Sequence, residues 1–308
     1  MSEHVLQDVP AQQRVLIFGY NRGRFLENAV ASALRHIPDA AVTVIDDHSD
    51  DAETLHILDG IRERIEVLRP SRGDVNDRVT GGLHHAMNFA FDRCEARGED
   101  TVLVLQDDMQ VVRDVGRQEI SEMASFFRLP SASFVLGCGF TKTYRGTRNA
   151  QMHRVGDFYF RNADATGVAT TYTDTGLFSI KRLRETIGRL TTGEASNQAR
   201  SAEAGLRLGI TTMPFVSFLP FPISYRKRKR AWGSEILDRV SGAGVHTITP
   251  LSGERLATFL ARDPDVLPFD ENWLTAPTAP PCQYWSYSGG KSNARARGGW
   301  RRLLAEFL

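Results

Sequence analysis

The feature that most constrains the fold is a regular alternation of short apolar runs and amphipathic stretches over the first 140 residues. Four short apolar runs predict buried strands at 14–18, 41–45, 65–68 and 101–105. Between them, apolar residues recur three and four positions apart, which predicts helices over 25–37, 55–61 and 83–94. Strands that alternate with helices at this spacing favour a parallel sheet with crossover helices. The expected fold class is therefore α/β, with a mostly parallel sheet flanked by helices.

Beyond residue 140 the alternation is weaker. Apolar and aromatic runs predict strands at 133–139, 157–161 and 176–180, and the stretch 210–219 is expected to be extended and buried. Helices are predicted at 198–208, 253–261 and 298–308. From residue 226 the chain is first basic and then rich in Pro, Gly and Ser, so 226–308 are expected to form a C-terminal extension.

The composition excludes several classes of protein. Lys and Arg total 38 against 37 Asp and Glu, so the net charge of +1 gives no overall attraction to nucleic acid. The three cysteines are far apart and form no CxxC motif, so neither a disulfide scaffold nor a cysteine zinc site is expected. The first residues are polar, and the apolar stretch 210–224 is too short and too rich in proline to span a bilayer. The expectation is a cytoplasmic protein that binds no nucleic acid.

Polar clusters follow three of the predicted strands. Tyr20-Asn21-Arg22 comes after the first strand, Asp46-Asp47 after the second and Asp107-Asp108 after the fourth. Because ligands of parallel sheets bind at the carboxyl ends of the strands, these clusters are expected to converge on one edge.

Each acidic pair has two interpretations. The carboxylates of Asp107-Asp108 repel one another, and a hard divalent cation that keeps positions open for phosphate oxygens would neutralise them. Alternatively, this pair caps the segment that follows. Asp46-Asp47 would accept hydrogen bonds from a nucleotide base or a ribose hydroxyl. Alternatively, this polar segment caps the next helix through Ser49 or Asp50, but a cap there does not explain Asp46-Asp47.

Four motifs together carry a resemblance to a known family. They are a turn after the first strand, an Asp-Asp-x-Ser-x-Asp strand end, a Gly-x-x-x-Ala-x-Asn helix start and an acidic motif after the fourth strand. In this chain they are Tyr20-Asn21-Arg22, 46–51, 82–88 and Gln106-Asp107-Asp108. In this order, over residues 13–115, they resemble the family 2 inverting glycosyltransferases of the GT-A fold. Gln106 replaces the first acid of the commoner Asp-x-Asp form, and the family's metal ligand is the last acid.

The resemblance implies binding of a nucleotide-diphospho-sugar, most commonly a UDP-sugar in this family. By position, Asp47 contacts the nucleotide base, Asp107 the ribose or a nearby sugar, and Asp108 a Mn²⁺ or Mg²⁺ ion on the diphosphate. The other candidates for the donor pocket are Tyr20, Asn21, Arg22, Asp46, Arg78, Gly82 and Asn88.

Inverting transfer also needs a carboxylate that deprotonates the acceptor hydroxyl while the nucleotide diphosphate leaves from the other face of the sugar. The family places this base in a Glu-Asp pair at a helix start, and that pair is absent here. Glu194, at a predicted helix start, is the first candidate. Glu203, which also reads as a solvent-facing helix charge, and Asp174 are the alternatives.

The resemblance further implies a glycosyltransferase domain over 12–225, with a nucleotide-binding half at 12–115 and an acceptor half at 116–225. The implied acceptor is a polysaccharide or a glycolipid. The basic run 226–230 is a candidate for closing over the leaving diphosphate or holding an anionic acceptor. The acid-free stretch 272–305 is a candidate for contact with anionic lipid at the inner face of a membrane. A solvated loop and a disordered tail are the alternatives.

Two other functions are compatible with the sequence. A sugar-nucleotide nucleotidyltransferase has a related fold, but it would carry a glycine-rich loop with Arg and Lys after the first strand, unlike residues 20–23. A catalytically inactive GT-A protein that serves as a binding or scaffold protein fits the missing Glu-Asp pair. Binding of UDP with Mn²⁺ discriminates, because a scaffold requires neither.

Overall fold

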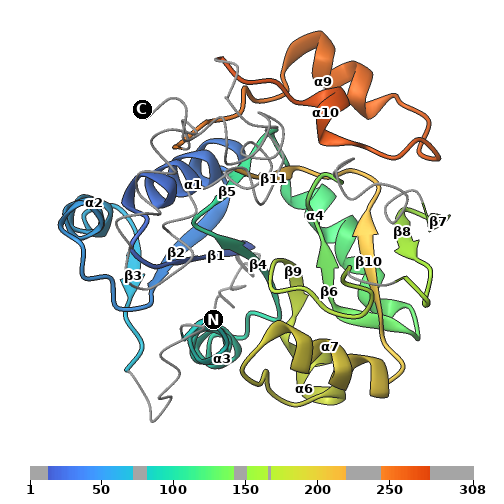
Figure 1. Cartoon of the computed structure of the whole chain (residues 1–308), viewed down its shortest axis with the longest axis horizontal. Helices are drawn as coiled ribbons and strands as arrows, with labels where there is room; N and C mark the ends of the chain where they lie inside the picture. Colours follow the sequence, from blue (N-terminus) through green and yellow to red (C-terminus); the bar gives the residue numbers. More distant parts are fainter. Residues whose placement is uncertain (1–12, 72–81, 142–150, 166–167, 220–243, 278–308) are drawn as a thin grey trace, which may run out of the picture.

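The computed structural model describes residues 13–71, 82–141, 151–165, 168–219 and 244–277 (Figure 1). Within these ranges the strands form one nine-stranded sheet in the order β3-β2-β1-β4-β9-β6-β10-β8-β7, and a two-stranded sheet joins β11 to β5. Helices cover both faces of the large sheet (Figure 1). The predicted α/β class is confirmed.

The first half of the chain alternates strands and helices as the periodicity predicts. Its elements are β1 (Gln13–Gly19), α1 (Gly23–His36), β2 (Ala40–Asp46), α2 (Ala52–Arg62), β3 (Glu66–Leu68), α3 (Leu83–Ala96) and β4 (Thr101–Gln106). Strand β1 pairs in parallel with both β2 and β4. Val15 and Ile17 of β1 pack with α1 and α2, whereas Leu16 and Phe18 pack with α3. Burial on both faces explains why these strands read as unbroken apolar runs.

The second half mixes parallel and antiparallel pairing. Its elements are β5 (Met109–Val111), α4 (Arg117–Ala124), the 3₁₀ turn η1 (Ser125–Arg128), β6 (Ala132–Gly137), β7 (Met152–Val155), β8 (Phe158–Arg161), β9 (Gly176–Ser179), α6 (Ile180–Thr186), α7 (Glu194–Glu203), β10 (Arg207–Thr211) and β11 (Val216–Phe218). Strand β9 lies between β4 and β6 and is antiparallel to both. This strand therefore joins the two halves in one continuous sheet.

The helix predicted at 198–208 is wrong in position. Helix α7 spans 194–203 and ends before Gly205, which adopts φ +69°, a left-handed conformation that suits glycine after a helix. Leu206, Leu208 and Ile210 are then all buried, two residues apart. That spacing of two is a strand pattern, and β10 begins at Arg207. The helix predicted at 298–308 lies outside the described residues.

The described part of the C-terminal extension packs on the main domain. It contains α9 (Gly253–Leu260) and α10 (Asp270–Trp273). Phe259 of α9 is fully buried, with its ring 5.3 Å from that of Phe140 and 5.2 Å from that of Trp273. Ile248 and Leu251 join the same cluster, together with Phe25 of α1. Residues 244–277 therefore share a hydrophobic core with the sheet domain. The basic run 226–230 lies outside the described residues.

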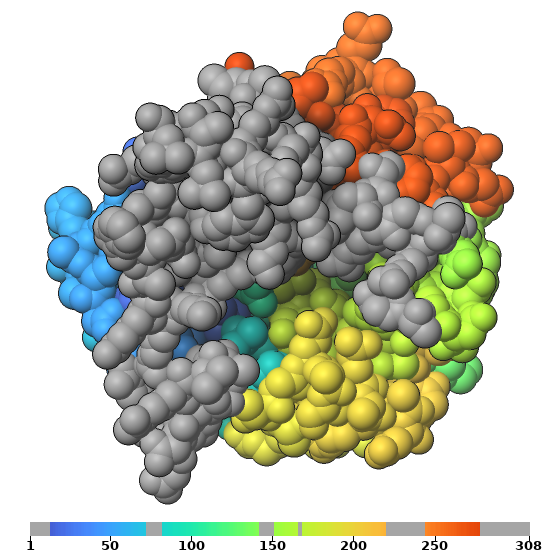
Figure 2. Space-filling model, viewed as in Figure 1, coloured from blue at the N-terminus to red at the C-terminus, as the bar shows by residue number. Residues whose placement is uncertain are grey.

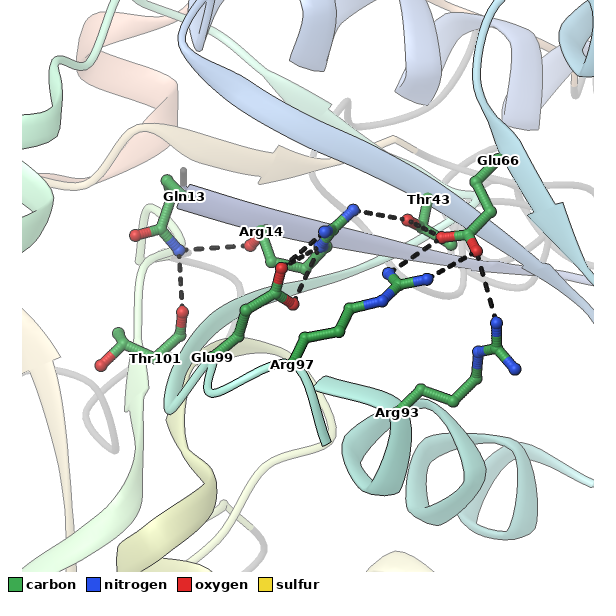
Figure 3. Close-up of polar contacts among 8 residues, drawn as sticks. All are labelled: Gln13, Arg14, Thr43, Glu66, Arg93, Arg97, Glu99 and Thr101. Atoms are coloured by element: carbon green, nitrogen blue, oxygen red, sulfur yellow. Dashed lines mark hydrogen bonds and ion pairs between the residues drawn. The ribbon is translucent and has the colours of Figure 1, made fainter. Parts of the chain in front are cut away.

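A network of ion pairs lies on the side of the sheet where the parallel strands begin (Figure 3). Arg14 binds Glu99 through two nitrogens, with contacts of 2.5 to 3.2 Å. Glu66 receives both Arg97 Nη2 at 2.9 Å and the hydroxyl of Thr43 at 3.1 Å. These bonds, with Arg97 first, lower the pKa of Glu66 below its ordinary value, against the opposing effect of burial.

Glu66→Gln should therefore remove a pH-dependent part of the stability. A carboxyl whose pKa is lowered by folding stabilises the native state above its ordinary pKa and loses that contribution as the pH falls through the native value. At pH 7 the variant should be less stable by at most about 1 kcal/mol, because the pair is partly solvent-screened. The difference from the unmodified chain should vanish at acidic pH, as measured by urea unfolding across a pH series. Glu27→Gln, at an exposed position on α1, is the control; an equal pH dependence in both variants would contradict the assignment.

Candidate active site

The carboxyl ends of β1, β2 and β4 meet at one edge, as the sequence predicts for parallel strands. In register, Gly19 pairs with Asp46, and Phe18 pairs with Gln106. The backbone continues this alignment past the strand ends, because Asp107 N–H donates to the carbonyl of Phe18 at 2.9 Å. The polar residues that follow all three strands therefore lie beside one another.

Arg22 joins the turn after β1 to the acidic pair after β4. Its Nη1 lies 2.8 Å from Oδ1 of Asp107 and 3.6 Å from Oδ2 of Asp108. The other oxygen of Asp107 accepts the backbone N–H of Tyr20 at 3.1 Å. Both carboxyl groups are buried, with Asp107 4% and Asp108 1% exposed. The guanidinium thus supplies part of the neutralising charge that the sequence analysis assigns to a cation.

Asp107 experiences two opposing effects. Burial raises the pKa of its carboxyl above the ordinary value, while the charge of Arg22 and the N–H of Tyr20 act to lower it. Burial is the larger effect, so the pKa of Asp107 lies above its ordinary value.

The two aspartates after β2 have different surroundings. Asp46 is fully buried; its Oδ2 lies 2.5 Å from Arg69 Nη2, and its Oδ1 accepts the N–H of Ser49 at 3.1 Å. Asp47 is half-buried, and its Oδ2 accepts the N–H of Gly82 at 2.8 Å, just before α3. A Cβ at position 82 would lie 2.6 Å from Asp47 Oδ1, so any residue larger than glycine would displace the Asp47 carboxylate from this position. Asp46 thus holds its own loop, and Asp47 faces the start of α3.

Asn21 connects the turn after β1 to the loop after β2. Its backbone adopts φ +50°, which asparagine tolerates better than most residues. Its N–H donates to Ser49 Oγ at 2.9 Å, and its side-chain Oδ1 accepts the N–H of Asp50 at 2.8 Å. The helix cap predicted at Ser49 or Asp50 is instead Asp51, whose side chain accepts the N–H of Thr54 at 3.0 Å. Ser49 and Asp50 are therefore used to fix the turn.

A cavity of about 960 Å³ lies next to this edge. Gln106 and Met109 line it from the end of β4 and from β5, and Asp174, Glu194 and Gln198 line it from the second half of the chain. Figure 2 shows the α6–α7 segment, in yellow, on the same face of the molecule as the teal residues of α3 and β4. The cavity is thus lined by two of the candidate bases and by the residues on either side of Asp107 and Asp108, while these two aspartates are not among its lining residues.

The three candidate bases occupy different positions. Asp174 precedes β9 and is 16% exposed at the cavity wall. Glu194 is the first residue of α7, after Gly193 with its φ of +96°, and is exposed to the cavity. Glu203 is the last residue of α7 and is exposed, outside the described cavity lining. The structure brings Asp174 and Glu194 together and leaves Glu203 apart.

His84, in the first turn of α3, bonds to the wall that carries these bases. Its Nε2 lies 2.9 Å from Oδ1 of Asp174, and its Nδ1 accepts the N–H of Gly193 at 3.3 Å. Tyr172 lies beneath, with its ring 6.4 Å from the imidazole. No local sequence pattern identifies this pair, because Asp174 lies 90 residues from His84 along the chain.

The remaining predicted site residues are Asn88 and Arg78. Asn88 is buried, and its amide makes two hydrogen bonds to the backbone of Leu190, at 2.8 and 3.1 Å. It therefore fastens α3 to the loop that precedes α7. Arg78 lies outside the described residues.

An α/β sheet with acidic side chains at its carboxyl edge is typical of enzymes that bind nucleotides. A family model described as Glycosyl transferase family 2 matches residues 15–185, which is more than half of the chain. The chain belongs to this family. This match favours sugar transfer over the rival nucleotidyltransferase reading.

Part of the chain is similar to solved structures at low sequence identity. Staphylococcus aureus TarS 1-349 is 17% identical with a TM-score of 0.45, over 66% of this chain and 59% of that one. The mannosyltransferase PcManGT from Pyrobaculum calidifontis, in complex with GDP-Man and Mn²⁺, is 17% identical with a TM-score of 0.43, over 76% and 62%. This chain therefore spans less than two thirds of each of these structures. No curated protein matches the sequence. Among the helices described, none has the length and apolar character needed to cross a membrane.

Proposed function

We propose that this glycosyltransferase moves a sugar, with inversion, from a UDP-linked donor to a hydroxyl group of a polysaccharide or glycolipid. One observation carries the proposal. Gln106 and Met109, which flank Asp107 and Asp108 in the sequence, line a cavity whose wall also carries two further carboxylates, Asp174 and Glu194. Donor binding and deprotonation of an acceptor need these two groups of carboxylates next to each other.

The donor would lie along the acidic edge. Asp47 would accept an N–H of the nucleotide base. Because Asp47 contacts Gly82, just before α3, the nucleotide would lie close to the backbone N–H groups of a helix N-terminus. Asp107, held by Arg22 and the Tyr20 N–H, would accept a ribose hydroxyl. UDP is the nucleotide proposed because it is the commonest donor nucleotide in the family.

The site fits a divalent ion that takes part of its ligands from the donor. Asp107 and Asp108 offer the hard oxygen ligands that Mg²⁺ and Mn²⁺ prefer. In the part of the chain that the structure describes, no group of three His, Cys, Asp or Glu residues forms a complete site. Asp108 would hold the ion, and the donor diphosphate would fill other positions, as is usual for Mg²⁺. Such an ion stabilises the negative charge of the leaving diphosphate.

Glu194 is the proposed base. As the first residue of α7 it lies at the positive end of the helix dipole, which favours the ionised carboxylate that a base requires. It would take the proton of the acceptor hydroxyl in the cavity while the diphosphate leaves from the opposite face of the sugar. Asp174, on the same wall, is the alternative base.

The proposal is tested by incubating the full chain with a panel of UDP-sugars and Mn²⁺ and measuring release of UDP. Release with at least one sugar is expected, and NMR of the product with a model acceptor would show the inverted anomer. Absence of UDP binding in calorimetry, together with absence of turnover, would overturn it. Contact with an anionic membrane surface is a separate prediction, from residues outside the described ranges.

Asp47→Ala should weaken UDP binding and reduce selectivity for UDP over other nucleoside diphosphates. A charge-assisted hydrogen bond is worth about 1.5–3 kcal/mol, which corresponds to a loss of about 10- to 100-fold in affinity. Calorimetry with UDP, GDP and ADP measures both effects. Asp39→Ala, at an exposed turn on the opposite edge of the sheet, is the control. Unchanged UDP affinity in Asp47→Ala would assign Asp47 a structural role only.

A further inference from the structure

One buried imidazole connects three segments of the site that are far apart in sequence. His84 is 9% exposed and lies in the first turn of α3. Its two ring nitrogens bond to Asp174, before β9, and to Gly193, directly before α7. Burial alone requires partners for both ring nitrogens; what distinguishes His84 is that one partner is a candidate base, Asp174, and the other directly precedes Glu194.

The two bonds define the tautomer of His84. A backbone N–H can only donate, so Nδ1 accepts the hydrogen bond from Gly193 and carries no proton. The proton of the neutral ring is then on Nε2, which donates it to Asp174. The imidazole therefore directs one oxygen of the Asp174 carboxylate toward α3 and fixes the start of α7.

Both candidate bases lie within electrostatic range of the same neighbouring tyrosine, Tyr172. Burial raises the pKa of Tyr172 well above its ordinary value, and the negative charges of Asp174 and Glu194 raise it further. Tyr172 itself packs beside the His84 ring. His84 and Tyr172 thus lie behind the part of the cavity wall that carries Asp174 and Glu194.

The same helix start also contacts the proposed donor edge. Gly82, two residues before His84, donates its N–H to Asp47. One turn later, Asn88 holds the backbone of Leu190, in the loop that leads to α7. The first two turns of α3 therefore touch the donor edge through Gly82 and the base-bearing wall through His84 and Asn88.

We propose that His84 is a positioning residue for the transfer step, an inference that rests on the proposed function. It holds Asp174 and, through Gly193, the start of α7 with Glu194, so that the base faces the acceptor while α3 contacts the donor. A small displacement of a base is enough to slow a reaction by about 10²-fold. Loss of His84 should therefore reduce the rate of transfer and leave donor binding intact.

The test uses three substitutions in the full chain. In His84→Ala, kcat for transfer should fall by about 10²-fold, while KM for the donor and Kd for UDP stay within about twofold. His84→Gln can keep a donor to Asp174, and His84→Asn can keep an acceptor for Gly193. Partial recovery in His84→Gln supports positioning of Asp174, and partial recovery in His84→Asn supports positioning of Glu194. The matched control is His85→Ala, whose imidazole instead contacts the carbonyl of Ser71.

Two results would overturn the proposal. The first is a kcat near the unmodified value in all three His84 variants. The second is a loss of UDP binding and of thermal stability that parallels the loss of activity, since this is what a purely structural role predicts. Because the amide variants keep one bond each, they keep the test decisive if His84→Ala fails to fold.

A spectroscopic measurement separates failure of this inference from failure of the proposed function. ¹⁵N NMR of the unmodified chain should show His84 as the Nε2-protonated tautomer, and Asp174→Asn should shift its Nε2 resonance. If no donor is turned over but this signature is present, the proposed function fails, whereas the hydrogen bonds from His84 to Asp174 and Gly193 are confirmed. If the ring is protonated on Nδ1, or if Asp174→Asn leaves the Nε2 resonance unchanged, His84 does not make these two hydrogen bonds, and the inference fails whatever the activity.

Discussion

Asp108→Asn is expected to abolish divalent-dependent binding of the nucleotide while the fold persists. Loss of a residue that only supports a metal ligand costs about 10–100-fold in affinity, so loss of the ligand itself should cost more than about 100-fold. The backbone contact at this position, from Leu219 N–H to the Asp108 carbonyl at 2.7 Å, does not depend on the side chain. Asparagine also keeps the size of the buried aspartate. Calorimetry with UDP, with and without Mn²⁺, measures the effect, and thermal unfolding checks the fold.

Arg22 explains why the fold should survive this substitution. Its shorter contact is to Asp107, at 2.8 Å, and the 3.6 Å contact to Asp108 is secondary. With Asp108 neutral, the guanidinium still pairs with Asp107, so no buried charge is left uncompensated. Asp59→Asn, at a position 71% exposed on α2, is the control and should bind like the unmodified chain. If Asp108→Asn keeps Mn²⁺-dependent binding, then Asp108 is not the metal ligand.

The convergence of the site was predictable because it depends on strand direction. Parallel strands buried on both faces carry continuous apolar runs, and the residues after those runs must share an edge. Tyr20-Asn21-Arg22, Asp46-Asp47 and Asp107-Asp108 meet there as expected. The position of the proposed donor site can therefore be predicted from the sequence.

The partners of these residues were not predictable from the sequence. Asp46 pairs with Arg69, and Asp174 pairs with His84, through contacts that the packing of distant segments decides. Neither pair has a spacing that a local pattern reveals. The short strand β5 and the edge strand β7 were missed for a similar reason, since three or four residues carry too little periodicity to identify a strand.

Glu194→Gln is expected to reduce transfer by roughly 10²- to 10⁴-fold, the usual loss when a general base is removed. Glutamine keeps the size and the hydrogen-bonding reach of the side chain but cannot accept the proton. Donor binding should be nearly unchanged, because the proposed donor contacts are Asp47, Asp107 and Asp108. Single-turnover transfer assays, with UDP affinity measured in parallel, separate the two effects.

Helix α7 supplies a matched control for this prediction. Glu194 and Glu203 are the first and last residues of the same ten-residue helix, so they lie about 14 Å apart along its axis. Glu194 lines the cavity, whereas Glu203 is exposed to solvent away from it. Glu203→Gln should therefore transfer sugar at close to the unmodified rate. The reverse result, with Glu203→Gln inactive and Glu194→Gln active, would move the base to the far end of the helix.

Asp174→Asn completes the comparison, because Asp174 shares the cavity wall with Glu194. If Glu194 is the base, Asp174→Asn should cause a smaller loss than Glu194→Gln, since it only weakens the hydrogen bond from His84. If Asp174 is the base, the order of the two losses is reversed and His84 acts directly on the reacting carboxylate. Two variants that both transfer at the unmodified rate would remove both carboxylates from the mechanism. In that case the proton of the acceptor must leave by a group outside this wall, although the donor edge would remain as described.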